Sequence, residues 1–155
     1  MAESMILNRA VVPVAFTVDD RDDAQAAAGR AIPLARWLTL HEEGADLAET
    51  GVILRGDSDP APLAVHLDAL AFVAVAFPKF ADGRGYSHAR RLRALWSYDG
   101  PIVAFGDVLR DQLHYMERSG INGFLLRSDQ DPRACLAAFS LYSSPYQYVP
   151  ETPAF

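Results

Sequence analysis

Reactive side chains and glycines are concentrated between Pro78 and Gly85 of the sequence. An aspartate, Asp82, and an arginine, Arg84, stand there on either side of a glycine. Glycine tolerates a positive φ and lets a ligand approach the main chain closely. An arginine beside the start of a helix is typical of a site for sulfate, sulfite, phosphate or a carboxylate, because the free N–H groups of the first turn also face the anion. The residues predicted to bind such an anion here are Gly83, Arg84, Gly85 and Ser87.

A second group of charged residues follows the next apolar segment, at Asp107 and Arg110. Neighbouring parallel strands would bring this group to the same sheet edge as Asp82 and Arg84. Two carboxylates could then act as general bases, while the two arginines hold an oxyanion. The structural alternative is that Asp82 pairs with Arg84 and braces the turn. In the same way, Asp107 could cap the helix that follows it, and Arg110 could be a solvated neighbour of His114.

Several familiar site types do not match this sequence. The Gly-x-Gly within GRGYSH lacks the third glycine of a dinucleotide fingerprint, and no Walker-type phosphate loop is present. The four histidines stand on separate expected helices without the spacing of a metal site, so we predict no metal. The one cysteine, Cys135, cannot form an intramolecular disulfide or hold an iron–sulfur cluster by four thiolates, and we expect it to be a buried apolar residue. The sequence does not identify a cofactor.

The composition indicates a globular protein of the cytoplasm. The chain has 155 residues, of which 50% are hydrophobic and 22% charged, enough for one domain with its own core. Its net charge of −6 argues against nucleic acid or an anionic membrane surface as a partner. No apolar run reaches the roughly 20 residues that span a bilayer.

The hydrophobic pattern predicts a single α/β domain over residues 1–142. From residue 51 onward, short apolar strands alternate with helical segments, which implies parallel strands and right-handed crossovers. We therefore expect a mostly parallel sheet of four to five strands, either open or part of a barrel. Residues 143–155 form an extended tail, rich in proline and tyrosine, that could dock onto a second copy of the chain. The expected strands are 52–54, 72–77, 102–105 and 123–127, with a possible edge strand within 11–18. The expected helices are 59–70, 86–96, 107–116 and 131–142, with a further helix-forming stretch, 24–40, divided at Pro33.

Two motifs give the chain a family resemblance. The segment FPKFADGRGYS and the later segment GDVLRDQ together resemble the bacterial domain of unknown function 934, over roughly Gly51 to Arg127. The resemblance implies a connection with sulfite reduction, because members are described as oxidoreductases of that process. The chain departs from the family at Val103-Ala104, where relatives have Arg-Ala, and at Ser119-Gly120-Ile121, where they have a Cys-Gly-Phe-like stretch. The signature positions carried over are Phe77, Pro78, Phe80, Asp82, Gly83, Arg84, Gly85, Tyr86, Ser87, Gly106, Asp107, Arg110, Asp111 and Gln112.

Three functions remain open from the sequence. The first is an accessory protein of assimilatory sulfite reduction that binds a small anion or a redox partner, such as a sulfur-assimilation enzyme. The second is an oxidoreductase or other enzyme acting on a small oxyanion, with Asp82 or Asp107 as the base. The third is a structural module that associates through its C-terminal tail. A sulfite reductase itself is not expected, because that class needs four cysteines for its cluster.

Overall fold

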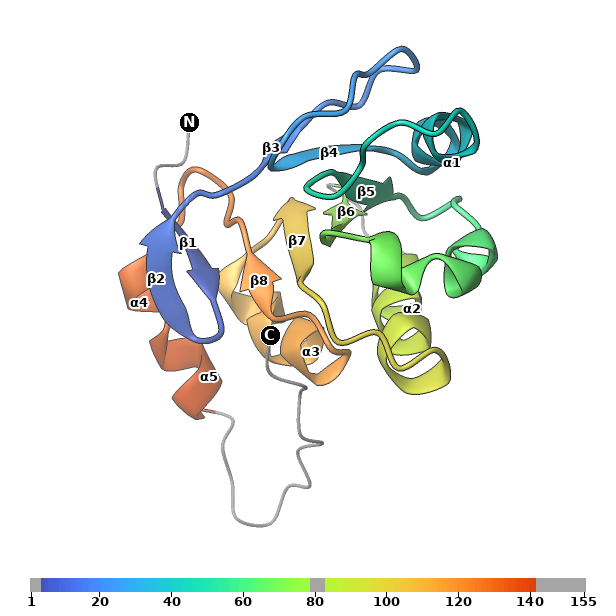
Figure 1. Cartoon of the computed structure of the whole chain (residues 1–155). Helices are drawn as coiled ribbons and strands as arrows, with labels where there is room; N and C mark the ends of the chain where they lie inside the picture. Colours follow the sequence, from blue (N-terminus) through green and yellow to red (C-terminus); the bar gives the residue numbers. More distant parts are fainter. Residues whose placement is uncertain (1–3, 79–82, 142–155) are drawn as a thin grey trace.

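The computed structural model describes residues 4–78 and 83–141, which form one mixed sheet of eight strands with helices packed against it (Figure 1). The strand order is β2-β1-β8-β7-β6-β5-β4-β3, and every neighbouring pair from β3 to β8 is parallel. The strands are β1 (Ser4–Leu7), β2 (Ala10–Pro13), β3 (Thr17–Val18), β4 (Arg30–Pro33), β5 (Gly51–Leu54), β6 (Val73–Phe77), β7 (Ile102–Gly106) and β8 (Gly123–Phe124). The helices are α1 (Leu34–Glu42), α2 (Arg84–Arg90), α3 (Leu113–Arg118), α4 (Pro132–Cys135) and α5 (Ala137–Leu141).

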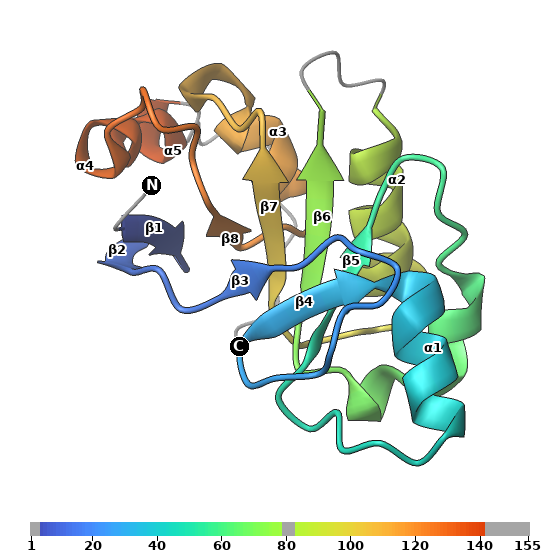
Figure 2. The same cartoon turned by 90° about the horizontal axis from the view of Figure 1, so that it is seen from above.

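The sheet is open and curled, with β2 and β3 as its two edges (Figure 2). From β3 to β8 the spatial order follows the chain order, so the right-handed crossovers place the helices on one face. The core on that face joins strand residues such as Val75 and Ala104 to helix residues such as Trp37, Leu92 and Met116. A smaller cluster fills the other face of the curl and contains only strand and loop residues: Met5, Phe16, Ala31, Ile53, Phe72, Ala74 and Val103.

The α/β class is confirmed, but the expected count of four to five strands is wrong. The antiparallel hairpin β1–β2 adds two strands beside β8, and β3 and β4 extend the parallel part at the other edge. The stretch 24–40, expected to be mostly helical, contains β4, which ends at Pro33, and most of α1, which follows it. Ala31 and Ile32 of β4 are both fully buried, one in each core cluster, so packing on both faces overrides their helix propensity.

Two expected helices are shorter than the pattern predicts. The segment expected as a helix over 59–70 forms two 3-10 turns, Ala61–Val65 and Leu67–Ala69. The segment after Asp107 begins with a 3-10 turn at Arg110–Gln112, and α3 starts only at Leu113. The expectation that Asp107 caps this helix is therefore wrong. The helix expected over 86–96 is present, as α2 followed by a π-helical turn over Arg91–Leu95.

Within the described ranges, no helix is long and apolar enough to cross a lipid bilayer. The C-terminal tail over 143–155 lies outside the described residues, so its docking onto a second copy stays a prediction.

Candidate functional site

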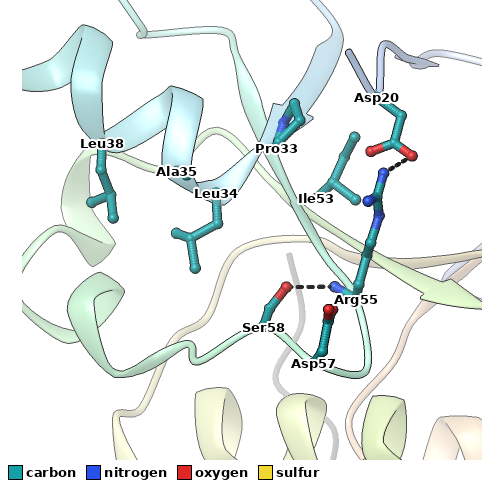
Figure 3. A pocket seen from close by; sticks show the side chains of 9 residues that line it. All are labelled: Asp20, Pro33, Leu34, Ala35, Leu38, Ile53, Arg55, Asp57 and Ser58. Carbon is teal, nitrogen blue, oxygen red and sulfur yellow. Dashed lines mark hydrogen bonds and ion pairs between the residues drawn. The ribbon is translucent and has the colours of Figure 1, made fainter. Parts of the chain in front are cut away.

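A cavity of about 330 Å³ lies at the carboxyl ends of β4 and β5 (Figure 3). Because β3, β4 and β5 are parallel, the segments that follow them meet at this edge of the sheet. Three segments contribute to its wall: the segment after β3, the first turns of α1 and the loop after β5. We call this cavity the β4–β5 pocket; it is lined by Asp20, Pro33, Leu34, Ala35, Leu38, Ile53, Arg55, Asp57 and Ser58.

An ion pair between Arg55 and Asp20 spans one side of the pocket (Figure 3). The two side chains are about half exposed, at 48% and 49%, so water reaches both charges. Ser58 Oγ accepts a hydrogen bond from the Arg55 backbone N–H at 2.9 Å, which leaves the hydroxyl proton able to donate elsewhere. This wall therefore presents one guanidinium, which is paired with Asp20, and one hydroxyl.

His88 anchors the loop that carries Arg55 through a hydrogen bond. The ring of His88 is buried, and its Nε2 lies 2.7 Å from the carbonyl oxygen of Arg55. A carbonyl oxygen only accepts, so Nε2 is the protonated nitrogen and donates this bond. The other ring nitrogen, Nδ1, is buried and has no hydrogen-bond partner within the described part of the chain. This hydrogen bond from His88 therefore restrains the position of the loop after β5 beside the pocket.

Arg84, the central residue of the predicted anion site, reaches this same loop. Its guanidinium lies over Gly56: a Cβ placed on that glycine would be 2.9 Å from Nε and 3.0 Å from Cζ of Arg84. Only a residue without a side chain leaves this space open. Arg84 is the first residue of α2 and is exposed. The structure therefore brings it to the residues between Arg55 and Asp57, beside the β4–β5 pocket.

The other predicted anion-site residues around Arg84 have separate roles. Gly83 precedes α2 with a φ of +85°, a conformation that favours glycine. Gly85 is buried, and a Cβ there would be 2.8 Å from the ring of Phe77, so its small size serves packing. Ser87 is exposed on α2. Asp82 lies outside the described residues, so its pairing with Arg84 stays a prediction.

The predicted group at Asp107 and Arg110 forms around a different arginine. Asp107 Oδ1 accepts a hydrogen bond from Arg127 at 3.0 Å, and Arg127 also binds both carboxylate oxygens of Asp129 at 2.6 Å each. These two carboxylates raise the pKa of Arg127, and the hydrogen bonds that Arg127 donates to Asp129 are the largest cause. The backbone N–H of Arg110 donates to Gln130 Oε1 at 3.2 Å. This group lies after β7 and β8, whereas Arg84 is directed toward the loop after β5.

Gly106 and Asp107 also tie together the ends of two central strands. Gly106 has a φ of +100°, and a Cβ there would be 2.4 Å from the carbonyl oxygen of Phe77. The Asp107 backbone N–H donates to that same oxygen at 2.7 Å. The Gly-Asp pair of the second motif therefore joins the end of β7 to the end of β6.

The sequence reasoning missed Asp20, Arg55 and Arg127. Arg55 directly follows a predicted strand, and Arg127 stands at the end of another, so the rule that selected Asp107 also applies to both. Asp20 could not be placed, because the strands on either side of it, β3 and β4, are short and were not separated in the pattern.

Histidines and the cysteine give no metal cluster within the described ranges, where no group of three or more His, Cys, Asp or Glu side chains converges. Two histidines expected on separate helices do come together: the rings of His41 and His66 lie 4.5 Å apart, next to Trp37. Cys135 is buried, as predicted, and burial raises the pKa of its thiol.

Comparison with known protein families identifies a match over most of the chain. The model of the family described as "Bacterial protein of unknown function (DUF934)" matches residues 51–155, which confirms the resemblance carried by the two motifs. None of the curated proteins matches the chain. The matched part includes the loop after β5, together with Arg84, Asp107 and Arg127. The remaining part of the pocket wall, from Asp20 to Leu38, precedes it.

Proposed function

We propose an oxyanion-binding function for this chain, which belongs to the DUF934 family of bacterial proteins of unknown function. The binding site is the β4–β5 pocket. The observation that carries the proposal is the convergence of two arginines on one short loop: Arg55 belongs to that loop, and the Arg84 guanidinium lies on Gly56 within it. Arginine presents five N–H donors in a planar fork that suits carboxylate, sulfonate and phosphate groups.

The ion pair between Arg55 and Asp20 is compatible with a ligand that binds in its place. An exposed or half-exposed pair contributes about 1 kcal/mol or less, because water screens both charges. An incoming oxyanion can therefore take over donors of Arg55 at small cost. Ser58 adds a hydroxyl donor on the same wall.

The family resemblance supports a place for this function in sulfite assimilation. We propose that the chain is an accessory protein that holds a small oxyanion, or presents it to a partner enzyme, rather than the reductase. The chain contains one cysteine, whereas a four-thiolate iron–sulfur cluster needs four. Arg84 belongs to the family signature, which favours it over Arg55 as the residue common to the family's ligand site.

A ligand screen tests this function directly. Sulfate, sulfite, adenylyl sulfate and the nicotinamide cofactors would each be added to the purified chain, and the melting temperature and amide NMR shifts followed. A ligand that binds only the folded state raises the melting temperature with its concentration. We expect oxyanions to bind the wild type and to bind Arg84→Ala more weakly. Arg90→Ala, an exposed arginine on the same helix, is the matched control and should bind like the wild type. If no oxyanion binds, the proposed function is wrong.

A further inference from the structure

We infer that the ligand of the β4–β5 pocket is a singly charged organic acid with a short apolar chain, a sulfonate or carboxylate rather than a bare inorganic ion. This inference rests on the proposed function and specifies its substrate class. It follows from three properties of the pocket: its two unlike walls, its volume and the charges at its rim.

The pocket has an apolar wall opposite a polar one (Figure 3). Leu34, Ala35 and Leu38 of α1 lie on one side, and the Arg55–Asp20 pair lies on the other. Pro33 and Ile53 continue the apolar surface toward the sheet, and Ser58 continues the polar surface toward the loop. A ligand that fills this pocket therefore meets guanidinium and hydroxyl donors at one end and hydrocarbon at the other.

The volume is larger than a tetrahedral ion requires. The cavity measures about 330 Å³, and cavities of about 300–1,000 Å³ are the usual size for organic ligands. Sulfate occupies roughly two or three times the ~30 Å³ that one water molecule takes in the liquid. A bare ion at Arg55 would leave most of the pocket to water, against the leucine wall. An alkyl chain would remove that apolar surface from water.

The rim favours one negative charge over two. Among the described residues, Asp20, Asp57 and one arginine, Arg55, line the pocket, and the Arg84 guanidinium lies beside them on Gly56, so two carboxylates already balance two guanidinium groups there. Each additional negative charge on a ligand would lie close to these two carboxylates. A sulfonate or carboxylate replaces the Asp20 carboxylate on Arg55 charge for charge, whereas sulfate and phosphate monoesters bring an excess charge.

A homologous series of alkyl sulfonates tests the inference. The dissociation constants of methane-, ethane-, propane- and butanesulfonate, and of sulfate, would be measured by NMR titration at constant ionic strength. Burial of one methylene is worth about 0.8 kcal/mol, so we expect the affinity to rise about fourfold per methylene until the pocket is full. Leu38→Ser should flatten this rise. Leu95→Ser, an exposed leucine of the π-helical turn after α2, is the matched control and should keep the wild-type slope.

The outcomes separate the inference from the function beneath it. An affinity that stays constant along the series, or sulfate binding more tightly than butanesulfonate, overturns the organic ligand while the oxyanion function stands. A rising series with the same slope in Leu38→Ser shows that the chain binds elsewhere, and also overturns the inference. No measurable binding of any anion overturns the proposed function itself. The wild-type series is decisive even if Leu38→Ser does not fold.

Discussion

Removal of the Asp20 carboxylate should tighten oxyanion binding. In the ligand-free pocket this carboxylate pairs with Arg55, and an incoming oxyanion must displace it. Asp20→Asn keeps the shape of the side chain and removes its charge. A pair with both partners half exposed is worth about 0.2–1 kcal/mol, so the variant should bind propanesulfonate about 1.4- to 5-fold more tightly. The loss of a like charge beside the ligand acts in the same direction.

The matched control for this variant is Asp22→Asn. Asp22 is an exposed residue of the same loop that does not line the pocket, and its substitution changes the net charge of the chain by the same amount. NMR titration of both variants with propanesulfonate, at two ionic strengths, separates a local effect from a general one. The gain for Asp20→Asn should shrink with added salt, because salt screens exposed charges. Weaker binding in Asp20→Asn, or equal gains in both variants, would refute the competition between Asp20 and the ligand.

Three further predictions concern the parts of the chain around the pocket. Gly56→Ala places a methyl group where the Arg84 guanidinium now lies. Because that flexible end can move, we expect an almost unchanged melting temperature but roughly 3- to 10-fold weaker propanesulfonate binding, which corresponds to about half of the free energy of a charged hydrogen bond. Binding equal to that of the wild type would show that Arg84 has no part in the site. Arg93→Ala removes a guanidinium that donates to the carbonyl oxygens of Tyr98, Gly100 and Gly120. Urea denaturation should therefore show a loss of about 3 kcal/mol in the free energy of unfolding. The control Arg90→Ala, at an exposed position, should lose less than about 0.5 kcal/mol. The hydrogen bond from Arg21 lowers the pKa of Asp19 to about 2, so this pair should contribute stability above pH 4 that is lost as the pH falls toward 2. In Arg21→Ala, NMR titration should show that the pKa of Asp19 has risen toward 3.8. An unchanged value would refute the pairing.

The strands of the second half of the chain could be predicted because their sequences are continuous apolar runs between clear turn signals. Val73–Phe77 and Ile102–Gly106 are the two central strands, covered on both faces, and their residues are almost all hydrophobic. The hydrophobic pattern of the first half does not mark its strands in this way. Arg30–Pro33 and Thr17–Val18 are short, and their pairing depends on neighbours that are distant in sequence.

None of the predicted site residues that the structure describes lines the β4–β5 pocket, and only Arg84 reaches the loop beside it. The rule that polar residues gather at the carboxyl ends of parallel strands was applied to β6 and β7, but it covers the ends of β4 and β5 as well. This rule does not predict that the Arg84 side chain extends to Gly56, in the loop after the neighbouring strand β5, or that Asp107 binds Arg127. Side-chain direction depends on tertiary packing, and the short pattern of the motif contains no information about it. Half of the pocket wall, from Asp20 to Leu38, comes from the part of the sequence that was hardest to interpret.

The most direct test of oxyanion binding in the β4–β5 pocket is a map of amide NMR shifts during titration with propanesulfonate. We expect saturable shifts concentrated in two segments, 33–38 at the start of α1 and 53–58 after β5, with smaller shifts at the start of α2. Shifts centred on 107–110 and 127–130 would place the ligand at the Asp107–Arg127 group instead. That result, or the absence of any saturable shift, would contradict the pocket as the binding site.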